Sequence, residues 1–151
     1  MPVRNLQQSP LHARILLVDD NAHGLSARKT VLEELGHRIS TASSASEALD
    51  QFSGQKFDLV VTDYKMPRMD GLELIRQMRK EDPDVPIILV SGYVDSLGLN
   101  ERSTGADVVI QKSANEVSHL VRSVGRLLRR KPVKKMPAAE SALSKLKRKV
   151  V

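Results

Sequence analysis

The chain alternates short apolar runs with stretches in which apolar positions recur at helical spacing. The runs are continuous and rich in β-branched residues, which is typical of strands buried on both faces of a parallel sheet. A weaker run around residues 38–42, where Ile39 stands between polar neighbours, favours an edge strand. The four stronger runs cover residues 15–18, 59–61, 87–90 and 108–110.

Amphipathic stretches that predict helices fall between these runs. Residues 22–35 place Leu25, Leu32 and Leu35 on one stripe, and Gly36 follows as a stop signal. Three further stretches begin with capping-box spacing, in which Ser or Asp is followed three residues later by Glu. These pairs are Ser44 with Glu47, Asp70 with Glu73, and Ser113 with Glu116.

The last of these stretches has the clearest helical period. Its apolar residues follow the i, i+3, i+4, i+7 rule and are Val117, Leu120, Val121, Val124 and Leu128. Residues 94–104 have little such period and include Gly98 and Asn100, so a helix there is expected to be short or mobile.

Five strand–helix units predict an α/β fold, with right-handed crossovers and helices on both faces of a parallel sheet in three layers. This domain is expected over residues 13–130, after a flexible N-terminal arm over residues 1–12. Pro132 and Pro137 end the last helix, so residues 131–151 form a separate basic tail. The tail is predicted to be disordered or a short amphipathic helix.

Composition narrows the possible function classes. No apolar stretch approaches the length of a membrane span, and no signal-peptide core precedes Ile15, so we expect a cytoplasmic protein. The absence of cysteine excludes thiolate metal sites and cysteine nucleophiles. Residues 131–151 contain seven basic residues and one acidic residue, whereas residues 1–130 contain 17 of each sign. The basic character therefore belongs to the tail.

Polar side chains follow the apolar runs at the points where functional groups gather in parallel sheets. Asp19 and Asp20 follow the first run, Asp63 the run at 59–61, Ser91 the next, and Lys112 the last. Three neighbouring carboxylates favour a divalent cation such as Mg²⁺, which prefers oxygen ligands. A carboxylate can also attack a phosphoryl group, and a lysine and a hydroxyl can then contact the phosphoryl oxygens.

Taken singly, these residues have simpler explanations. Asp19 and Asp20 also suit a helix cap, and Lys112 suits a solvated strand end. Gly71, which follows Asp63 in the chain, suits a local backbone requirement. Their co-location at strand ends favours a functional site.

This arrangement resembles the receiver domain of two-component response regulators over roughly residues 13–128. The resemblance is carried by Asp19-Asp20, by Asp63 with Met66-Pro67 and Asp70-Gly71, by Ser91-Gly92, and by Gly105-Ala106-Asp107 leading to Lys112. The family implies a flavodoxin-like fold with strand order 2-1-3-4-5. It also implies a signalling switch that catalyses only its own phosphorylation and dephosphorylation.

The resemblance assigns roles to individual residues. Asp63 would accept a phosphoryl group from a histidine kinase or a histidine phosphotransfer protein. Mg²⁺ would be bound by Asp20, Asp63 and the backbone carbonyl of Lys65, with Asp19 helping through water. Ser91 and Lys112 would contact the phosphoryl oxygens. The switch would act on a downstream protein as a monomer or a phosphorylation-dependent dimer, and the Met1 start favours a stand-alone receiver.

Two positions depart from the family pattern. Val109 replaces the usual aromatic residue three positions before the lysine, which puts the usual output switch in doubt. Ser113 replaces the usual proline after the lysine, so we expect a trans bond there, with Ser113 capping the following helix. These departures motivate an alternative, a receiver-like interaction module that works without phosphorylation.

Other interpretations remain open at this point. The basic tail could contact an acidic partner, a membrane surface or nucleic acid, although residues 131–151 are too few for a compact DNA-binding module. A phosphohydrolase with an aspartyl nucleophile is disfavoured, because Lys65 stands where a second aspartate is typical. Tyr93, two residues after Ser91, is a candidate for controlling access to Asp63.

Overall fold

Strands and helices alternate along the chain in the computed structural model, which describes residues 12–130. The strands are β1 (Arg14–Val18), β2 (Arg38–Ala42), β3 (Leu59–Asp63), β4 (Ile87–Ser91) and β5 (Val108–Gln111). The labelled helices are α2 (Ala22–Glu34), α3 (Ala45–Gly54), α4 (Gly71–Glu81), α5 (Val94–Leu97) and α6 (Glu101–Thr104). A further helix covers residues 116–130.

The five strands form one parallel sheet in the order β2-β1-β3-β4-β5. Ile15 of β1 is in register with Ile39 of β2 on one side and with Leu59 of β3 on the other. The chain therefore reverses its direction of travel across the sheet between β1 and β3. This confirms the predicted flavodoxin-like topology, including the edge position of β2.

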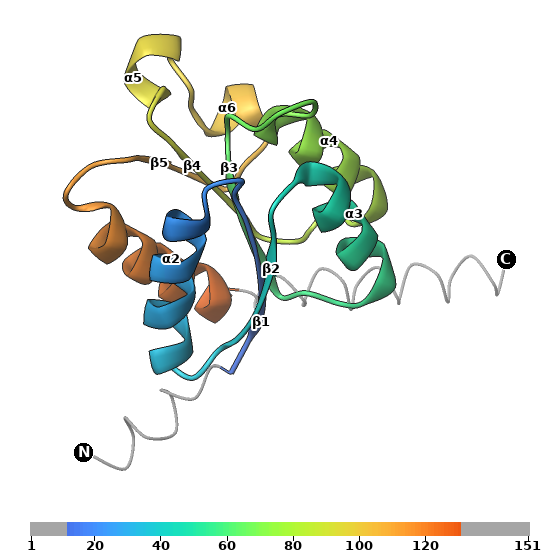
Figure 1. Ribbon diagram of the computed structural model, residues 1–151, viewed down its shortest axis with the longest axis vertical. Helices are drawn as coiled ribbons and strands as arrows, with labels where there is room; N and C mark the ends of the chain where they lie inside the picture. Colours follow the sequence, from blue (N-terminus) through green and yellow to red (C-terminus); the bar gives the residue numbers. More distant parts are fainter. Residues whose placement is uncertain (1–11, 131–151) are drawn as a thin grey trace, which may run out of the picture.

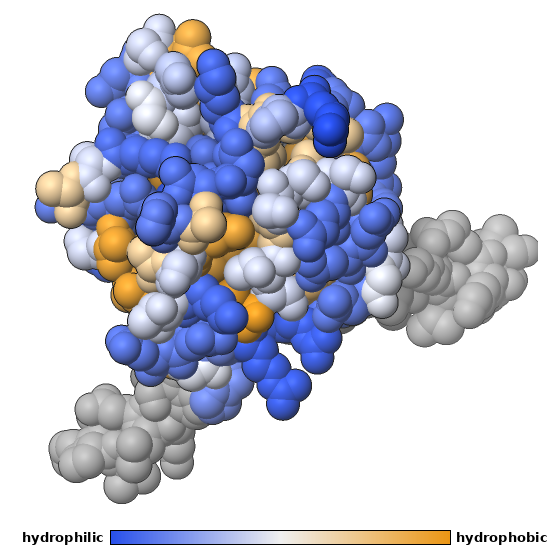
Figure 2. All heavy atoms as spheres, viewed as in Figure 1, coloured by the Kyte–Doolittle hydropathy of each residue, from blue (hydrophilic) through white to orange (hydrophobic). Residues whose placement is uncertain are grey.

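The sheet buries both of its faces, and its strands alternate between two apolar clusters. On β1, Leu16 and Val18 belong to the cluster that α3 and α4 cover, whereas Ile15 and Leu17 belong to the opposite cluster. Helix α2 and the helix over residues 116–130 cover that second face (Figure 1). Hydrophilic residues occupy most of the outer surface seen in Figure 2, with apolar residues showing in the gaps between them.

Two of the three predicted N-caps are confirmed. The side chains of Ser44 and Asp70 accept hydrogen bonds from the backbone N–H groups of Glu47 and Glu73, at 3.1 and 3.0 Å. The third is wrong in detail, because the helix begins at residue 116 and the Ser113 hydroxyl accepts from the N–H of Asn115. The Lys112–Ser113 bond is trans, as expected, since the described residues contain no cis peptide bond.

The apolar stripes are buried except for Leu35 and Val117, which are exposed, and Val121, which is only half-buried. Helix α2 ends at Glu34, and Gly36 follows with a φ of 100°, which permits the hydrogen bonds that close the helix. Leu35 was expected on the buried stripe but is 47% exposed, because it lies beyond the last helical turn. Val117 is 40% exposed, whereas Leu120 and Val124 in the following turns of its helix belong to the core.

Residues 94–104 form two four-residue helices, α5 and α6, which agrees with the expectation of short helical structure there. Gly98 lies between them in the left-handed conformation, which explains the break. The predicted arm, apart from residue 12, and the predicted tail over residues 131–151 lie outside the described residues. Within residues 12–130, no helix is both long enough and apolar enough to cross a membrane.

Candidate functional site

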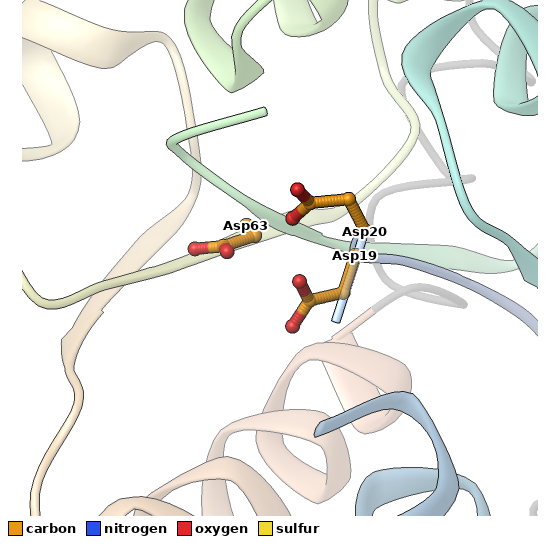
Figure 3. A group of neighbouring side chains, drawn as sticks. All are labelled: Asp19, Asp20 and Asp63. Atoms are coloured by element: carbon orange, nitrogen blue, oxygen red, sulfur yellow. The ribbon is translucent and has the colours of Figure 1, made fainter. Parts of the chain in front are cut away.

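Three carboxylates meet at the carboxyl ends of neighbouring strands. Asp19 and Asp20 follow β1 directly, and Asp63 is the last residue of β3, which pairs with β1. One carboxylate oxygen from each residue lies within 4.8 Å of the others. Figure 3 shows the three side chains extending from the two strand ends into one small region. Asp19 and Asp63 are buried, whereas Asp20 is exposed to solvent.

The Asp63 carboxylate is held by two donors. The backbone N–H of Tyr64 donates to Oδ1 at 2.8 Å, and the Lys112 ammonium donates to Oδ2 at 3.1 Å. Burial and the nearby negative charge of Asp19 raise the pKa of Asp63, although Lys112 acts in the opposite direction. The Lys112 ammonium therefore partly neutralises this carboxylate on one side. On the other side, where Asp19 and Asp20 lie, a metal ion could approach it.

The Asp19 carboxylate is also fully engaged. Its Oδ1 accepts from the N–H of Asn21 at 3.0 Å, and its Oδ2 accepts from the Arg28 guanidinium at 2.8 Å. Burial alone would raise the pKa of Asp19, but these hydrogen bonds and the nearby charge of Lys112 outweigh it and hold the pKa below its usual value. Asp19 thus carries its negative charge in a buried position.

Ser91 and Lys112 enter the site from the next two strands. Ser91 ends β4 one residue beyond Val90, which is in register with Asp63. The buried Ser91 hydroxyl accepts from the N–H of Tyr93 at 2.9 Å, and this leaves its own proton available for a hydrogen bond. The N–H of Lys112 donates to the carbonyl of Ser91 at 2.9 Å, which fixes the start of the lysine side chain beside β4.

The loop after β3 is shaped by a glycine. The N–H of Gly71 donates to the carbonyl of Tyr64 at 2.7 Å, which closes the loop against the end of β3. A Cβ atom at Gly71 would overlap the carbonyl oxygen of Asp63 and lie 3.0 Å from the Cα of Tyr64. The local backbone role predicted for Gly71 is therefore confirmed, because no side chain fits where α4 starts.

An aromatic pair stands beside the site. The Tyr64 and Tyr93 rings meet edge to face with centroids 6.1 Å apart, and the Lys65 ammonium lies 5.5 Å from the Tyr93 ring centroid. Tyr93 is 41% exposed. Val109, at the position usually occupied by an aromatic residue, is half-buried against the core face that α4 covers.

Sequence reasoning missed Arg28, which is also the partner of Glu116. Arg28 occupies the buried face of α2 between Leu25 and Leu32, and it pairs with both Asp19 and Glu116 at 2.8 Å. The available signal was a charged residue within an apolar stripe. Glu116 was interpreted as a capping-box residue, but its carboxylate accepts from Arg28.

The donor set suits a hard divalent cation. All three clustered side chains offer carboxylate oxygens, two of them buried, and oxygen is the ligand atom that Mg²⁺ prefers. The Lys112 ammonium donates to Asp63, so a metal ion among the acids would leave the lysine free to meet an anion. The residues present therefore fit Mg²⁺ together with a phosphoryl group.

Comparison with known proteins agrees with this geometry. Residues 15–124 match the family model described as the response regulator receiver domain. A probable transcriptional regulator, ycf27 of Cyanidium caldarium, is 32% identical over 140 residues, which cover 91% of this chain and 55% of that protein. The chain thus spans about half the length of this curated relative.

Solved structures show the same fold. The response regulator TrrA of Thermotoga maritima, crystallised in complex with Mg²⁺ and BeF, is 37% identical with a TM-score of 0.69. The match covers 76% of this chain and 97% of TrrA, which has also been crystallised with the histidine kinase ThkA. A CheY-like receiver domain of Methanospirillum hungatei is 31% identical with a TM-score of 0.73, covering 82% of this chain and 98% of that one.

Proposed function

The chain belongs to the response regulator receiver family of two-component signalling, and on that premise we propose that it accepts a phosphoryl group on Asp63. The observation that carries this proposal is the position of the Asp63 carboxylate, between two further acids and the Lys112 ammonium. Receiver domains are signalling proteins, so the reaction serves to change the state of the chain itself.

The proposed chemistry needs positioning more than proton transfer. A carboxylate oxygen of Asp63 attacks the phosphorus of the donor, and the bond from phosphorus to the donor nitrogen or oxygen breaks with its electron pair. Lys112 then contacts a phosphoryl oxygen as a point charge, and the Ser91 hydroxyl donates a further hydrogen bond. Later attack of water on phosphorus releases inorganic phosphate and restores the carboxylate.

Asp20, Asp63 and the backbone carbonyl of Lys65 are the proposed Mg²⁺ ligands, with Asp19 acting through a water molecule. The ion supplies neutralisation of the charge on the phosphoryl oxygens and the acids. Asp19, buried and fixed by two donors, would keep one negative charge in place for it. We propose a histidine kinase or histidine phosphotransfer protein as the donor, in the cytoplasm, with output through contacts to a downstream protein.

The test is phosphorylation by acetyl phosphate with MgCl₂, followed by intact-mass spectrometry. The wild type should gain the mass of one phosphoryl group, and it should gain none when EDTA replaces MgCl₂ in the reaction. Asp63→Asn should gain none, whereas Asp50→Asn, an exposed aspartate on α3, should behave as the wild type. Equal labelling of Asp63→Asn and the wild type would overturn the proposal.

A second candidate function has one observation in its favour. Val109 is a half-buried aliphatic residue that cannot swing inward as an aromatic ring does, so the chain could signal through a surface that phosphorylation does not alter. Signalling in cells that survives Asp63→Ala favours this second function. Loss of signalling with retained protein level favours the phosphorylation-dependent switch.

A further inference from the structure

A buried arginine connects the acidic site to the start of the last helix. Arg28 projects from α2 and is 5% exposed. Its Nη1 donates to Asp19 Oδ2 at 2.8 Å, and its Nε donates to Glu116 Oε2 at 2.8 Å. One guanidinium charge is therefore shared between an acid beside Asp63 and an acid in the first turn of the helix over residues 116–130.

The fold leaves space for this arrangement. A Cβ atom at Gly24, one turn before Arg28, would lie 2.9 Å from Asp19 Oδ2 and 3.4 Å from Arg28 Nη1. The glycine therefore allows the buried carboxylate and the guanidinium to approach each other. Glu116 is 17% exposed, so the Arg28–Glu116 pair is shielded from solvent far more than an ordinary surface ion pair.

We propose that Arg28 is a positioning residue that moderates the affinity of the acidic site for Mg²⁺ and links that site to the first turn of the helix over residues 116–130. The inference rests on the proposed function, because it concerns the Mg²⁺ site assigned there. Arg28 acts through Asp19 and Glu116 and does not itself contact the phosphoryl group.

The signs of the expected effects follow from charge. The Arg28 guanidinium competes with a cation for Asp19, so Arg28→Met should increase Mg²⁺ affinity, by about fivefold. Glu116 draws part of the guanidinium charge away, so Glu116→Gln should decrease Mg²⁺ affinity. Because Glu116 acts through Arg28, the effect of Glu116→Gln should largely disappear in the Arg28→Met background.

The experiment is an NMR titration of the full chain with MgCl₂, reading the amide groups near Asp63 and those of residues 116–119. In the wild type both sets should shift along one binding curve, because a single Mg²⁺ binding event is expected to reach residues 116–119 through Asp19, Arg28 and Glu116. In Arg28→Met the amides near Asp63 should still shift and those of residues 116–119 should not. Arg28→Lys keeps the charge but lacks the fixed fork that holds two acids, so it should also uncouple residues 116–119.

Two exposed residues provide matched controls. Arg126→Met on the last helix and Glu34→Gln at the end of α2 make the same charge changes without touching the buried pairs, and both should match the wild type. Circular dichroism checks that each variant folds. If Arg28→Met does not fold, the Mg²⁺ affinity of Glu116→Gln and the amide shifts of Arg28→Lys test the inference instead. This inference alone is overturned if the Mg²⁺ affinity is unchanged in all variants, or if it falls in both Arg28→Met and Glu116→Gln. A wild type that binds no Mg²⁺ overturns the proposed function as well.

Discussion

At the scale of single residues, the ionised Asp63 carboxylate destabilises the fold when no metal ion is bound, despite its ion pair with Lys112. Its pKa is raised above the ordinary value of 3.8 because it is buried near Asp19. The folded chain therefore binds this proton more tightly than the unfolded chain does. It follows that the free energy of unfolding falls as the pH rises from about 4 through the raised pKa, and the penalty is complete once the pH is above that pKa.

Replacement of Asp63 by Asn should remove this penalty. In metal-free buffer at pH 7 we expect Asp63→Asn to raise the free energy of unfolding by about 1 kcal/mol, measured by urea denaturation. The gain should shrink as the pH falls through the raised pKa, because the wild-type carboxyl then takes up its proton. Saturating MgCl₂ should stabilise the wild type and reverse the order of the two proteins. A metal-free Asp63→Asn chain less stable than the wild type at pH 7 would contradict this account.

The candidate role of Tyr93 in controlling the access of water to Asp63 leads to a prediction. Its ring packs edge-on against Tyr64 and lies beside the Lys65 ammonium, next to the carboxyl end of β3. Tyr93→Ala should therefore lose its phosphoryl group severalfold faster than the wild type after removal of the donor. Tyr93→Phe keeps the ring and should match the wild type. Equal decay rates for Tyr93→Ala and the wild type would show that the ring does not shield the site.

At the scale of elements, the junction between β3 and α4 leaves no room for a side chain at Gly71. Gly71 begins α4 directly against the carbonyl of Asp63. Gly71→Ala should lower the free energy of unfolding by about 2–3 kcal/mol and reduce labelling of Asp63, because the added methyl group displaces the end of β3. Gly54→Ala is the matched control, since a Cβ there meets nothing within 4 Å. It should be neutral or stabilising by up to about 1 kcal/mol in thermal or urea unfolding.

The elements themselves were largely predictable from the sequence. The apolar run at residues 15–18 specifies β1 because each of its side chains meets a cluster on one face of the sheet or the other. The exposures of Leu35 and Val117 were not predictable, because an apolar period does not say which of its residues reach the core. Ser113 and Glu116 likewise have the spacing of a capping box. The Glu116 carboxylate, however, accepts from Arg28 of α2 instead of from the backbone N–H of Ser113.

The site was predictable to the extent that strand ends specify it. Asp19, Asp63 and Lys112 follow apolar runs, and parallel strands bring such positions to one edge. Arg28 was not predictable, because a charged residue on a helix is usually solvated and only the fold reveals the two acids that it meets.

At the scale of the whole molecule, strand order explains why distant residues form one site. Because β1 lies next to β3, the acids after β1 face Asp63 across a single strand spacing. Because β4 and β5 follow on the same side, Ser91 and Lys112 extend this group along the same edge. The site therefore depends on the sheet as a unit and uses four of its five strands.

The distribution of charge over the whole chain leads to a final prediction. Residues 131–151 carry seven basic residues and one acidic residue, whereas residues 1–130 carry equal numbers of both signs. Removal of residues 131–151 should leave the urea unfolding of the domain and the labelling of Asp63 by acetyl phosphate unchanged. Retention on heparin at low salt should be lost, because binding to a polyanion scales with the number of neutralising cations. Replacement of the seven basic residues of 131–151 by Gln should abolish retention on heparin in the same way. Equal retention of the chain with and without residues 131–151 would place the polyanion-binding surface on the domain.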